Sequence, residues 1–556
     1  MTGAATGART GGQVLADQLR LHGTRAVYCV PGESYLGLLD ALAGLRDEID
    51  VVACRQEGGA AVMAEAHGKL TGRVGVCAVT RGPGATNASI GLHTAAQDSS
   101  PMLLLVGQVA RGHLGREAFQ ELDLGAVFGT MAKWVATVHD PARLPELVAR
   151  AFTTALSGRP GPVVLGLPED VLTEVVTVAD AAPAVPAQPA PGQPELTRLR
   201  ELLAAAERPL VIAGGPGWTQ AACDDLLAFA TASSLPVAVS FRSQDVVDNT
   251  AAAYAGHLGT GRVPAGLDDR VKAADLLVVI GPRLGEITTA GYTLLGVPRP
   301  AQTLVHVHPD PEELGSVHQA ELPIVASTAR FAAALRELEP IASPRWAPWA
   351  AAARAAYEAA LEPLEPPPAG VDLAEVFTWL RDRLPADAIM TNGAGNFSGW
   401  AHRFHQFRRY RTQLGPTSGA MGYALPAALA AKHAEPGRVV LAVTGDGDFL
   451  MTGQELATAV RHDLAVIVLV VDNGQYGTIR MHQIAAHPGR PIATSLANPD
   501  FAAFARSFGV HGETVETAAD FPAAFERAAA AGGPALICLR TDPDTIAPGR
   551  VVGPGL

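Results

Sequence analysis

Short apolar runs alternate with longer stretches of helical periodicity along this chain of 556 residues. One of the longest runs, at 464–471 (LAVIVLVV), is too short to cross the ~30 Å of a bilayer core but suits a strand buried on both faces. Strands that alternate with helices form βαβ units, which assemble into parallel sheets. The sequence therefore predicts an α/β fold of doubly wound parallel-sheet domains. Ligands of such sheets bind at the carboxyl ends of the strands, so the chemistry is expected there.

Two proline-rich segments without periodicity, at 181–194 and 363–370, are expected to be extended linkers. They leave three blocks of similar size, at 1–180, 191–345 and 371–545. The expected strands are 26–30, 51–54, 74–80, 102–106, 209–213, 236–240, 276–280, 304–307, 388–391, 439–444, 466–471 and 535–539. The expected helices include 57–69, 349–361, 424–432 and 454–461.

The composition excludes several classes of protein. Lys and Arg number 42 against 55 Asp and Glu, a net charge of −13, which disfavours binding to nucleic acid or to a membrane surface. Apolar residues make up 48% of the chain and charged residues 17%, which argues against disorder. The five cysteines form no C-x-x-C pair, so neither a disulfide framework nor a thiolate zinc site is expected. The first dozen residues lack the apolar core of a signal peptide, and the expected location is the cytoplasm.

The third block carries the clearest chemical signal. The apolar run at 439–444 leads directly into Gly-Asp-Gly at 445–447, and the next run ends at Asp-Asn-Gly, 472–474. Either tripeptide alone is usually only a turn. At the ends of consecutive strands, however, they would bring Asp446 and Asn473 close together, and their oxygens suit Mg²⁺. The pair therefore favours a site for a metal and a diphosphate.

The segment 445–477 (GDGDFLMTGQELATAVRHDLAVIVLVVDNGQYG) resembles the fingerprint of thiamine diphosphate-dependent enzymes of the acetolactate synthase-like branch. Asp472 stands where the family has the first of two asparagines. The resemblance implies a pyrimidine-binding domain at 1–180, a central domain at 191–345 and a diphosphate- and Mg²⁺-binding domain at 371–545. It implies Asp446, Asn473 and the Gln475 carbonyl as metal ligands. It also implies cofactor contacts at Gly395, Asn396, Phe397, Gly445, Gly447, Asp448, Tyr476, Gly477, Thr478 and Ile479.

Glu57 opens the helix that follows the apolar run at 51–54. Taken alone, an acidic residue in a first helical turn is explained by the helix dipole. The segment nevertheless resembles the family's Glu-x-x-Ala-x-x-Met-Ala, whose glutamate bonds the aminopyrimidine of the cofactor. The resemblance implies that Glu57 helps to remove a proton from the thiazolium carbon, which then adds to a 2-oxo acid and takes up the electrons left by CO₂.

Three further segments resemble family motifs. The loop at 80–87 (TRGPGATN) resembles Gly-Pro-Gly-x-Thr-Asn and implies cofactor contacts from Pro83 and Asn87, although alone it is a generic turn. The segment at 119–121 (FQE) resembles the family's Phe-Gln-Glu, which implies that Phe119 and Gln120 lie on the substrate side.

The segment at 415–423 (GPTSGAMGY) is the third. It implies that the backbone of Gly419 and Met421 bonds the pyrimidine and that the Met421 side chain bends the cofactor, which brings two reacting atoms together. Without the resemblance, Met421 would be a gap-filling core residue.

The sequence also departs from acetolactate synthases. Glu33 occupies a position that is glycine there and aspartate in pyruvate decarboxylase-like enzymes, so it is a candidate proton donor or acceptor. His482 replaces a bulky tryptophan of the acceptor pocket, and Phe397 replaces a histidine. The segment 281–293 lacks the Phe-Asp-Asp of flavin-carrying members, so flavin is not expected.

The leading interpretation is a thiamine diphosphate- and Mg²⁺-dependent enzyme that decarboxylates a 2-oxo acid, with pyruvate favoured, and transfers the acyl unit to a second carbonyl. The alternative is simple decarboxylation with release of an aldehyde, which Glu33 favours. A further alternative is a dinucleotide-binding oxidoreductase, based on the glycine-rich segment 213–217, although that segment lacks a G-x-G-x-x-G pattern. The resemblance further implies a homodimer or homotetramer with the active site at the subunit interface.

Overall fold

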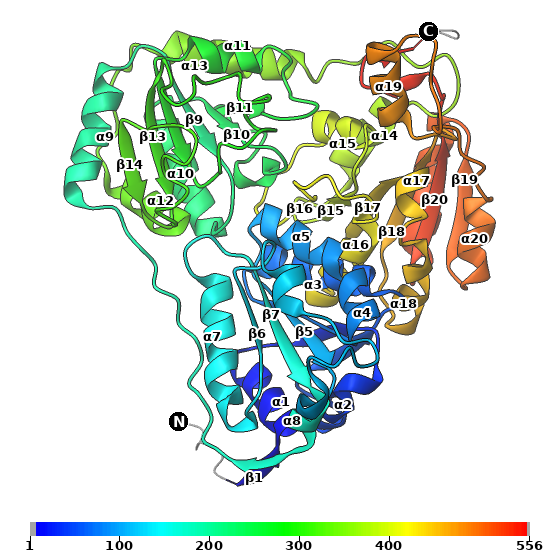
Figure 1. Ribbon diagram of the computed structural model, residues 1–556. Helices are drawn as coiled ribbons and strands as arrows, with labels where there is room; N and C mark the ends of the chain where they lie inside the picture. Colours follow the sequence, from blue (N-terminus) through cyan, green and yellow to red (C-terminus); the bar gives the residue numbers. More distant parts are fainter. Residues whose placement is uncertain (1–6, 553–556) are drawn as a thin grey trace. The chain divides into compact units, whose positions relative to one another are not determined.

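The computed structural model describes residues 7–552 and contains three parallel sheets of six strands each (Figure 1). The first has the order β3-β2-β4-β5-β7-β6, the second β11-β10-β9-β12-β13-β14, and the third β16-β15-β17-β18-β20-β19. The predicted fold class of doubly wound parallel sheets is confirmed. No helix within residues 7–552 is both long and apolar enough to span a membrane.

The first sheet consists of β2(Ala26–Cys29), β3(Asp50–Ala53), β4(Gly75–Val79), β5(Met102–Gln108), β6(Trp134–Thr137) and β7(Pro162–Pro168). The helices of this part of the chain are α1(Gly11–Leu21), α2(Leu36–Ala43), α3(Glu57–Thr71), α4(Gly82–Asn87), α5(Ser89–Asp98), α6(Leu124–Phe128), α7(Leu144–Leu156) and α8(Glu169–Thr173). Helices α1, α2 and α7 share one apolar core with alternate residues of the strands, and α3 lies against β2, β4 and β5. A small antiparallel pair joins β1(Ala8–Thr10) to β8(Val175–Thr177).

The second sheet consists of β9(Pro209–Ala213), β10(Val237–Val239), β11(Tyr254–His257), β12(Leu276–Ile280), β13(Thr303–His308) and β14(Leu322–Val325). Its helices are α9(Gln193–Ala205), α10(Gln220–Ala232), α11(Leu267–Ala273), α12(Thr328–Glu337) and α13(Ala347–Ala359). The glycine-rich turn after β9 is tightly packed, because a Cβ at Gly215 would lie 2.2 Å from the Gly281 carbonyl oxygen. Packing therefore accounts for glycine at this position without a dinucleotide.

The third sheet consists of β15(Ile389–Asn392), β16(Gln413–Leu414), β17(Val440–Gly445), β18(Ile467–Asp472), β19(His511–Val515) and β20(Ala535–Arg540). The helices of this part are α14(Leu373–Arg383), α15(Ser398–Phe404), α16(Ala424–Ala434), α17(Asp446–Phe449), α18(Leu456–Arg461), α19(Gly477–Ala486), α20(Phe501–Ser507) and α21(Phe521–Ala530). A second antiparallel pair, β21(Thr545–Ala547) with β22(Arg550–Val551), follows.

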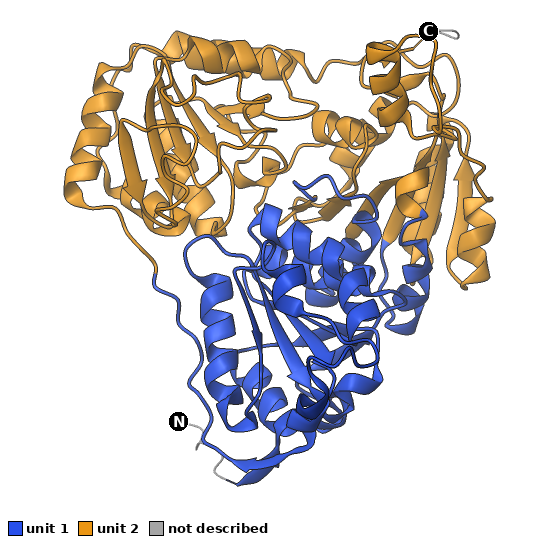
Figure 2. Cartoon of the chain, viewed as in Figure 1, with its two compact units in different colours: residues 1–187, 416–437, 450–466 blue, residues 188–415, 438–449, 467–556 orange. Residues whose placement is uncertain are grey.

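The chain divides into two compact units that do not follow the order of the sequence (Figure 2). Unit 1 comprises residues 1–187, 416–437 and 450–466, and unit 2 comprises the remainder. Unit 1 holds the first sheet together with α16 and α18, whereas unit 2 holds the second and third sheets. Within unit 1, α16 packs on α3, and the Tyr423 hydroxyl donates a hydrogen bond of 2.7 Å to Glu65.

All twelve expected strands are present, with ends that differ by at most two residues. Missed were the edge strands β6, β11, β14, β16 and β19, the interior strand β7 and the two antiparallel pairs. Strands β6, β14 and β19 are partly exposed, so they lack the continuous apolar run that reveals a buried strand. Strands β11 and β16 are buried, but their short sequences, YAGH and QL, contain polar residues or glycine and form no apolar run. Strand β7 begins and ends in proline, a residue that argues against an interior strand. The expected helix at 454–461 begins as a 3₁₀ turn, Gly453–Glu455, and continues as α18.

Helices α3 and α5 approach closely because small residues face each other where they meet. A Cβ at Gly91 would lie 2.5 Å from the Cβ of Ala61. We expect Gly91→Ala to overpack this contact and to lower the apparent melting temperature by about 2–5 °C. The reason is that a methyl group inserted into a close-packed site lowers the free energy of unfolding by about 1–3 kcal/mol. Thermal melts check this. Gly112→Ala is the control, since nothing lies within 4 Å of its Cβ, and equal melting temperatures for the two variants would contradict the packing argument.

Candidate functional site

The candidate residues of the first and third blocks lie near the point in each sheet where the order of the strands reverses direction. In the first sheet the chain runs from β2 outward to β3 and returns to β4, and in the third it runs from β15 outward to β16 and returns to β17. At such switch points the loops leave the sheet in opposite directions and open a crevice at the carboxyl ends of the strands. In the first block, Glu33 follows β2, Glu57 follows β3, and Pro83 and Asn87 follow β4, whereas Phe119 and Gln120 follow β5. Many of the candidates in the third block follow β15, β17 and β18.

Glu57 is the first residue of α3, and the Gln56 side chain caps this helix by accepting a hydrogen bond of 3.1 Å from the Gly59 amide. The Asn87 amide group donates a hydrogen bond of 2.9 Å to Glu57 Oε2. A Cβ at Gly84 would lie 3.3 Å from Glu57 Oε1, so the absence of a side chain at Gly84 leaves room beside that oxygen. The structure thus brings Glu57 and Asn87 together and fixes one carboxylate oxygen.

The other candidates of the first block surround the loop at 80–87. Gly82 donates its backbone N–H to the carbonyl of Gln120 at 2.9 Å, and Gln120 has a left-handed φ of +63°. The Ser34 hydroxyl lies 2.9 Å from that of Thr80, which anchors the turn that carries Glu33. Pro83 occupies the first turn of α4. The Phe119 side chain is 76% exposed and Glu33 is also exposed.

Arg81 lies in the same loop, at 80–87. Its guanidinium forms an ion pair of 2.6 Å with Glu169. The carboxylate compensates the positive charge, so Arg81 supplies little net attraction for a distant anion.

Glu455, which the sequence did not single out, supports the start of α3. This buried carboxylate accepts hydrogen bonds from the backbone amides of Arg55 at 3.2 Å and Gln56 at 3.1 Å, and from the hydroxyl of Thr458. Burial raises the pKa of Glu455, and these hydrogen bonds act in the opposite direction. The carboxylate thereby fixes the two residues that precede Glu57.

Glu65 lies on α3, two turns after Glu57. It is fully buried and accepts hydrogen bonds from Ser100 and Tyr423. Burial raises its pKa from 4.5 to about 7, although nearby Lys69 acts to lower it. The folded chain therefore binds a proton that the unfolded chain has released between about pH 4.5 and 7, so this group stabilises the fold less as pH rises through that window. We expect Glu65→Gln, which does not titrate, to gain melting temperature relative to the unsubstituted chain from pH 5 to 7.5 and to level off above.

Thermal melts at several pH values measure this difference. The control is Glu201→Gln, because Glu201 is exposed beside Arg198. The melting temperature of this variant relative to the unsubstituted chain should not change with pH. A Glu65→Gln difference that does not change with pH would contradict the assignment.

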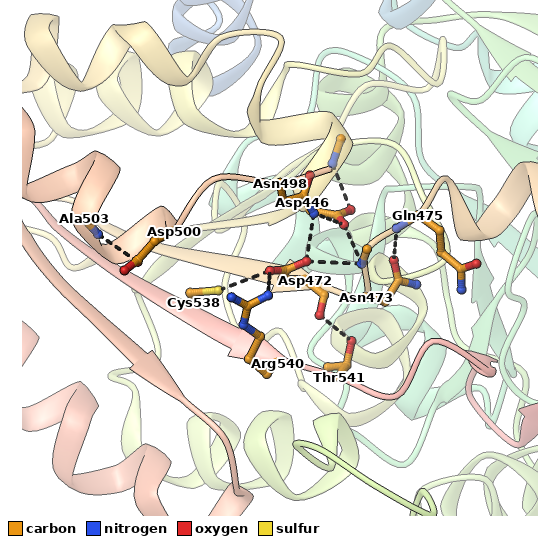
Figure 3. Close-up of polar contacts among 12 residues, drawn as sticks. Asp446, Asp472, Asn473, Gln475, Asn498, Asp500, Ala503, Cys538, Arg540 and Thr541 are labelled. Atoms are coloured by element: carbon orange, nitrogen blue, oxygen red, sulfur yellow. Dashed lines mark hydrogen bonds and ion pairs between the residues drawn. The ribbon is translucent and has the colours of Figure 1, made fainter. Parts of the chain in front are cut away.

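In the third sheet, Asp446 follows β17 and lies beside the end of β18. The two strands are parallel neighbours, with Gly445 opposite Val471. Asp446 Oδ1 accepts the Gly447 amide at 2.9 Å, and Oδ2 accepts the Gly474 amide at 2.9 Å and the Asn498 side-chain amide at 2.8 Å (Figure 3). Burial raises the pKa of Asp446 to about 6, the hydrogen bonds from Gly447 and Asn498 act to lower it, and the neighbouring Asp472 carboxylate acts to raise it. The expected approach of the two strand ends is thus present.

The two other expected metal ligands lie in the turn after β18. Asn473 Oδ1 accepts the Gln475 amide at 3.2 Å, and the Gln475 carbonyl accepts the Gly477 amide at 2.9 Å. The Gln475 side chain donates to Pro543 instead. No cluster of three His, Cys, Asp or Glu side chains in the described part of the chain could hold a metal. A cation beside Asp446 would therefore take amide, carbonyl and phosphate oxygens, the kind of ligand set that Mg²⁺ accepts.

Helix α19 begins beside this turn and fits an anionic group. Its N-cap residue, Tyr476, provides no side-chain hydrogen bond to the first turn, and uncapped N–H groups at a helix N-terminus bind phosphate. The Tyr476 amide itself donates to Thr494 at 2.8 Å. The Thr478 hydroxyl accepts the Asn396 amide at 2.9 Å, which brings the loop after β15 to the same helix end. The donor set thus fits a diphosphate with its metal.

The remaining candidates of the third block have varied surroundings. The Phe397 ring lies against Gly395 and Gly445, where a Cβ would approach it within 2.5 Å and 2.9 Å. Asp448 is buried and accepts a hydrogen bond of 2.6 Å from Thr444. Ile479 is 52% exposed on α19, and His482 is exposed on the same helix.

Gly419 and Met421 belong to unit 1, as Glu57 does. Gly419 has a φ of +68°, which favours glycine, and Met421 is half-buried. The neighbouring Thr417 amide donates to Asp98 at 2.8 Å, which ties this loop to α5. The structure thus groups the candidates for pyrimidine contact in one unit and those for diphosphate and metal in the other.

Three models of thiamine pyrophosphate enzyme domains match the chain: the N-terminal TPP binding domain at residues 9–127, the central domain at 196–336 and the C-terminal TPP binding domain at 393–539. The chain belongs to the thiamine pyrophosphate enzyme family. The acetolactate synthase large subunit of Parasynechococcus marenigrum is 35% identical over 90% of this chain and 83% of its own length. The acetolactate synthase isozyme 2 large subunit of Escherichia coli is 30% identical over 96% and 95%.

Proposed function

We propose that this chain is a thiamine diphosphate-dependent enzyme that decarboxylates a 2-oxo acid, with pyruvate as donor, and transfers the acyl unit to a second carbonyl. The observation that carries this proposal is Asp446, held at the end of β17 beside the turn 473–475 and the uncapped start of α19. The similarity to acetolactate synthase large subunits over nearly the whole chain supports the same reaction.

Each group of candidate residues has a separate role in the proposed reaction. Asp446, Asn473 and the Gln475 carbonyl would hold Mg²⁺, and the first turn of α19 would hold the diphosphate. Thiamine diphosphate, when bound, supplies a nucleophilic carbon and an electron sink for the decarboxylation. Glu57 would exchange a proton with the cofactor through Oε1, the carboxylate oxygen beside Gly84, while Asn87 keeps Oε2 in place. Gly419 and Met421 would position the pyrimidine, and Gln120 and Phe119 would face the substrate.

Further parts of the proposal concern the whole molecule. We assign 1–180 to pyrimidine binding, 191–345 to a central domain and 371–545 to diphosphate and Mg²⁺ binding. The active protein is a homodimer or homotetramer in the cytoplasm, with the active site at the subunit interface. Size-exclusion chromatography with light scattering measures the oligomeric state, and a monomer with full activity would refute the interface assignment.

A second candidate function is decarboxylation with release of an aldehyde. The observation that favours it is Glu33, an exposed carboxylate in the turn after β2, anchored through Ser34 to the loop that contains Asn87.

Product analysis separates the two functions. Two pyruvates give acetolactate and one CO₂ by ligation, whereas one pyruvate gives acetaldehyde and CO₂ by simple decarboxylation. Pyruvate should be supplied alone and together with a second 2-oxo acid, and the products identified by mass spectrometry. Acetolactate or a mixed 2-hydroxy-3-oxo acid is the expected result. Acetaldehyde as the sole product would establish the alternative, and no product from either mixture would refute both.

A further inference from the structure

Asp472 is the position at which this chain departs from the family's paired asparagines, and its surroundings explain how a carboxylate is accommodated there. It is 2% exposed. Its Oδ2 atom pairs with Arg540 at 2.5 Å, the residue directly opposite it on β20. Its Oδ1 atom accepts the Asn498 side-chain amide at 2.9 Å and the Gly474 amide at 3.2 Å. Both oxygens accept hydrogen bonds, and the ion pair with Arg540 compensates the negative charge, so Asp472 is a poorer metal ligand than Asp446.

Asp446 and Asp472 share two hydrogen-bond donors. The Asn498 side-chain amide donates to Asp446 Oδ2 as well as to Asp472 Oδ1, and the Gly474 backbone amide does the same (Figure 3). These contacts fix the rotation of the Asp446 carboxylate about its terminal bond. Its Oδ1 atom accepts one hydrogen bond, from Gly447, among the contacts of residues 7–552. Oδ1 thus retains a lone pair for a cation.

The balance of charges also favours Asp446 over Asp472 as the metal ligand. Two carboxylates held side by side repel each other, and a second negative charge would also oppose a diphosphate. Arg540 compensates the charge of Asp472, because its guanidinium contacts the oxygen that faces away from Asn498. One uncompensated carboxylate, Asp446, then remains for the dication.

We propose that Asn498, Asp472 and Arg540 together form a positioning unit for the metal-binding aspartate. Asn498 orients Asp446 so that Oδ1 is available to the metal, and Arg540 balances the charge that Asp472 introduces. Asp472 and Arg540 are therefore a matched pair. Replacing Asp472 alone leaves an extra positive charge at the site, and replacing Arg540 alone leaves an extra negative charge. The inference rests on the proposed Mg²⁺–thiamine diphosphate site.

The first experiment measures binding of Mn²⁺, as a spectroscopic substitute for Mg²⁺, by electron paramagnetic resonance in the presence of thiamine diphosphate. Asn498→Ala should raise the Mn²⁺ dissociation constant about 10- to 100-fold, as is usual when a group that orients a metal ligand is lost. The matched control is Asp500→Ala, which removes the N-cap of α20 two residues further on, a contact of 2.9 Å to the Ala503 amide. The control should lower the melting temperature and leave Mn²⁺ affinity within about twofold.

An Asn498→Ala variant that binds Mn²⁺ as tightly as the unsubstituted chain, or an equal loss in Asp500→Ala, would overturn the role of Asn498. An unsubstituted chain that binds neither Mn²⁺ nor thiamine diphosphate would overturn the proposed function together with this inference. The two failures are therefore distinguishable.

The second experiment tests the matched pair with Asp472→Asn, Arg540→Gln and the double variant. Asp472→Asn leaves the Arg540 cation uncompensated and should weaken Mn²⁺ binding by about 3- to 10-fold. Arg540→Gln leaves an extra carboxylate and should weaken thiamine diphosphate binding at saturating Mg²⁺, measured by calorimetry, by a similar factor. The double variant should recover both affinities to within about twofold. Losses that add in the double variant would refute the pairing.

Discussion

Replacing Glu57 with glutamine should lower the rate of decarboxylation by about 10²–10⁴-fold and leave the affinity for Mg²⁺ and thiamine diphosphate within about threefold. Glutamine has the same shape and can still accept the Asn87 hydrogen bond at the position of Oε2. It cannot hold a transferable proton at the other position, beside Gly84. The variant therefore removes proton transfer while it preserves the geometry of the start of α3.

Steady-state kinetics with pyruvate and calorimetric titration with thiamine diphosphate measure the two quantities separately. Asp123→Asn is a suitable control, because Asp123 caps α6 through the Ala126 amide at 3.0 Å in the same unit without touching Glu57. Its rate should remain within about threefold of that of the unsubstituted chain. A Glu57→Gln variant with a near-normal rate would contradict the role of Glu57, and an inactive Asp123→Asn variant would point to general disruption of unit 1.

Replacing Asp446 with asparagine should weaken Mg²⁺ binding in the presence of thiamine diphosphate by at least about 100-fold, since loss of a ligand costs no less than loss of a group that orients one. The substitution is nearly isosteric but chemically incompatible with its surroundings. Both carboxylate oxygens accept N–H groups, from Gly447 on one side and from Gly474 and Asn498 on the other. Whichever way an asparagine is turned, its NH₂ group opposes a donor, and one anionic ligand charge is lost.

Metal affinity is measured with Mn²⁺ by electron paramagnetic resonance, and activity is measured over a range of Mg²⁺ concentrations. Activity of Asp446→Asn should recover in part at high Mg²⁺, because the defect lies in metal binding. Asp520→Asn serves as the control, since Asp520 is exposed and its carboxylate accepts a hydrogen bond of 2.7 Å from the hydroxyl of nearby Thr517. Metal affinity within threefold of normal in Asp446→Asn would exclude Asp446 as a ligand.

Continuous apolar runs predicted the central strands well, because a strand buried on both faces needs apolar residues at every position. Edge strands such as β14 and β19 are exposed along part of their length, so their sequences resemble those of loops. The approach of Asp446 to the turn after β18 was likewise predictable, since consecutive parallel strands place their carboxyl ends at one edge of the sheet. No comparable rule applies to Asn498, which lies in a loop, 26 residues after Asp472.

The sequence by itself determined the α/β class, the central strands and the residue types at the ends of those strands, because these depend on local patterns of burial and on motifs a few residues long. Only the tertiary structure decided that α16 and α18 pack in unit 1, that Glu455 holds the residues before Glu57, and that Arg540 compensates Asp472. These contacts join residues 68 to 400 positions apart. Such pairings are set by the packing of whole elements, which no local pattern encodes.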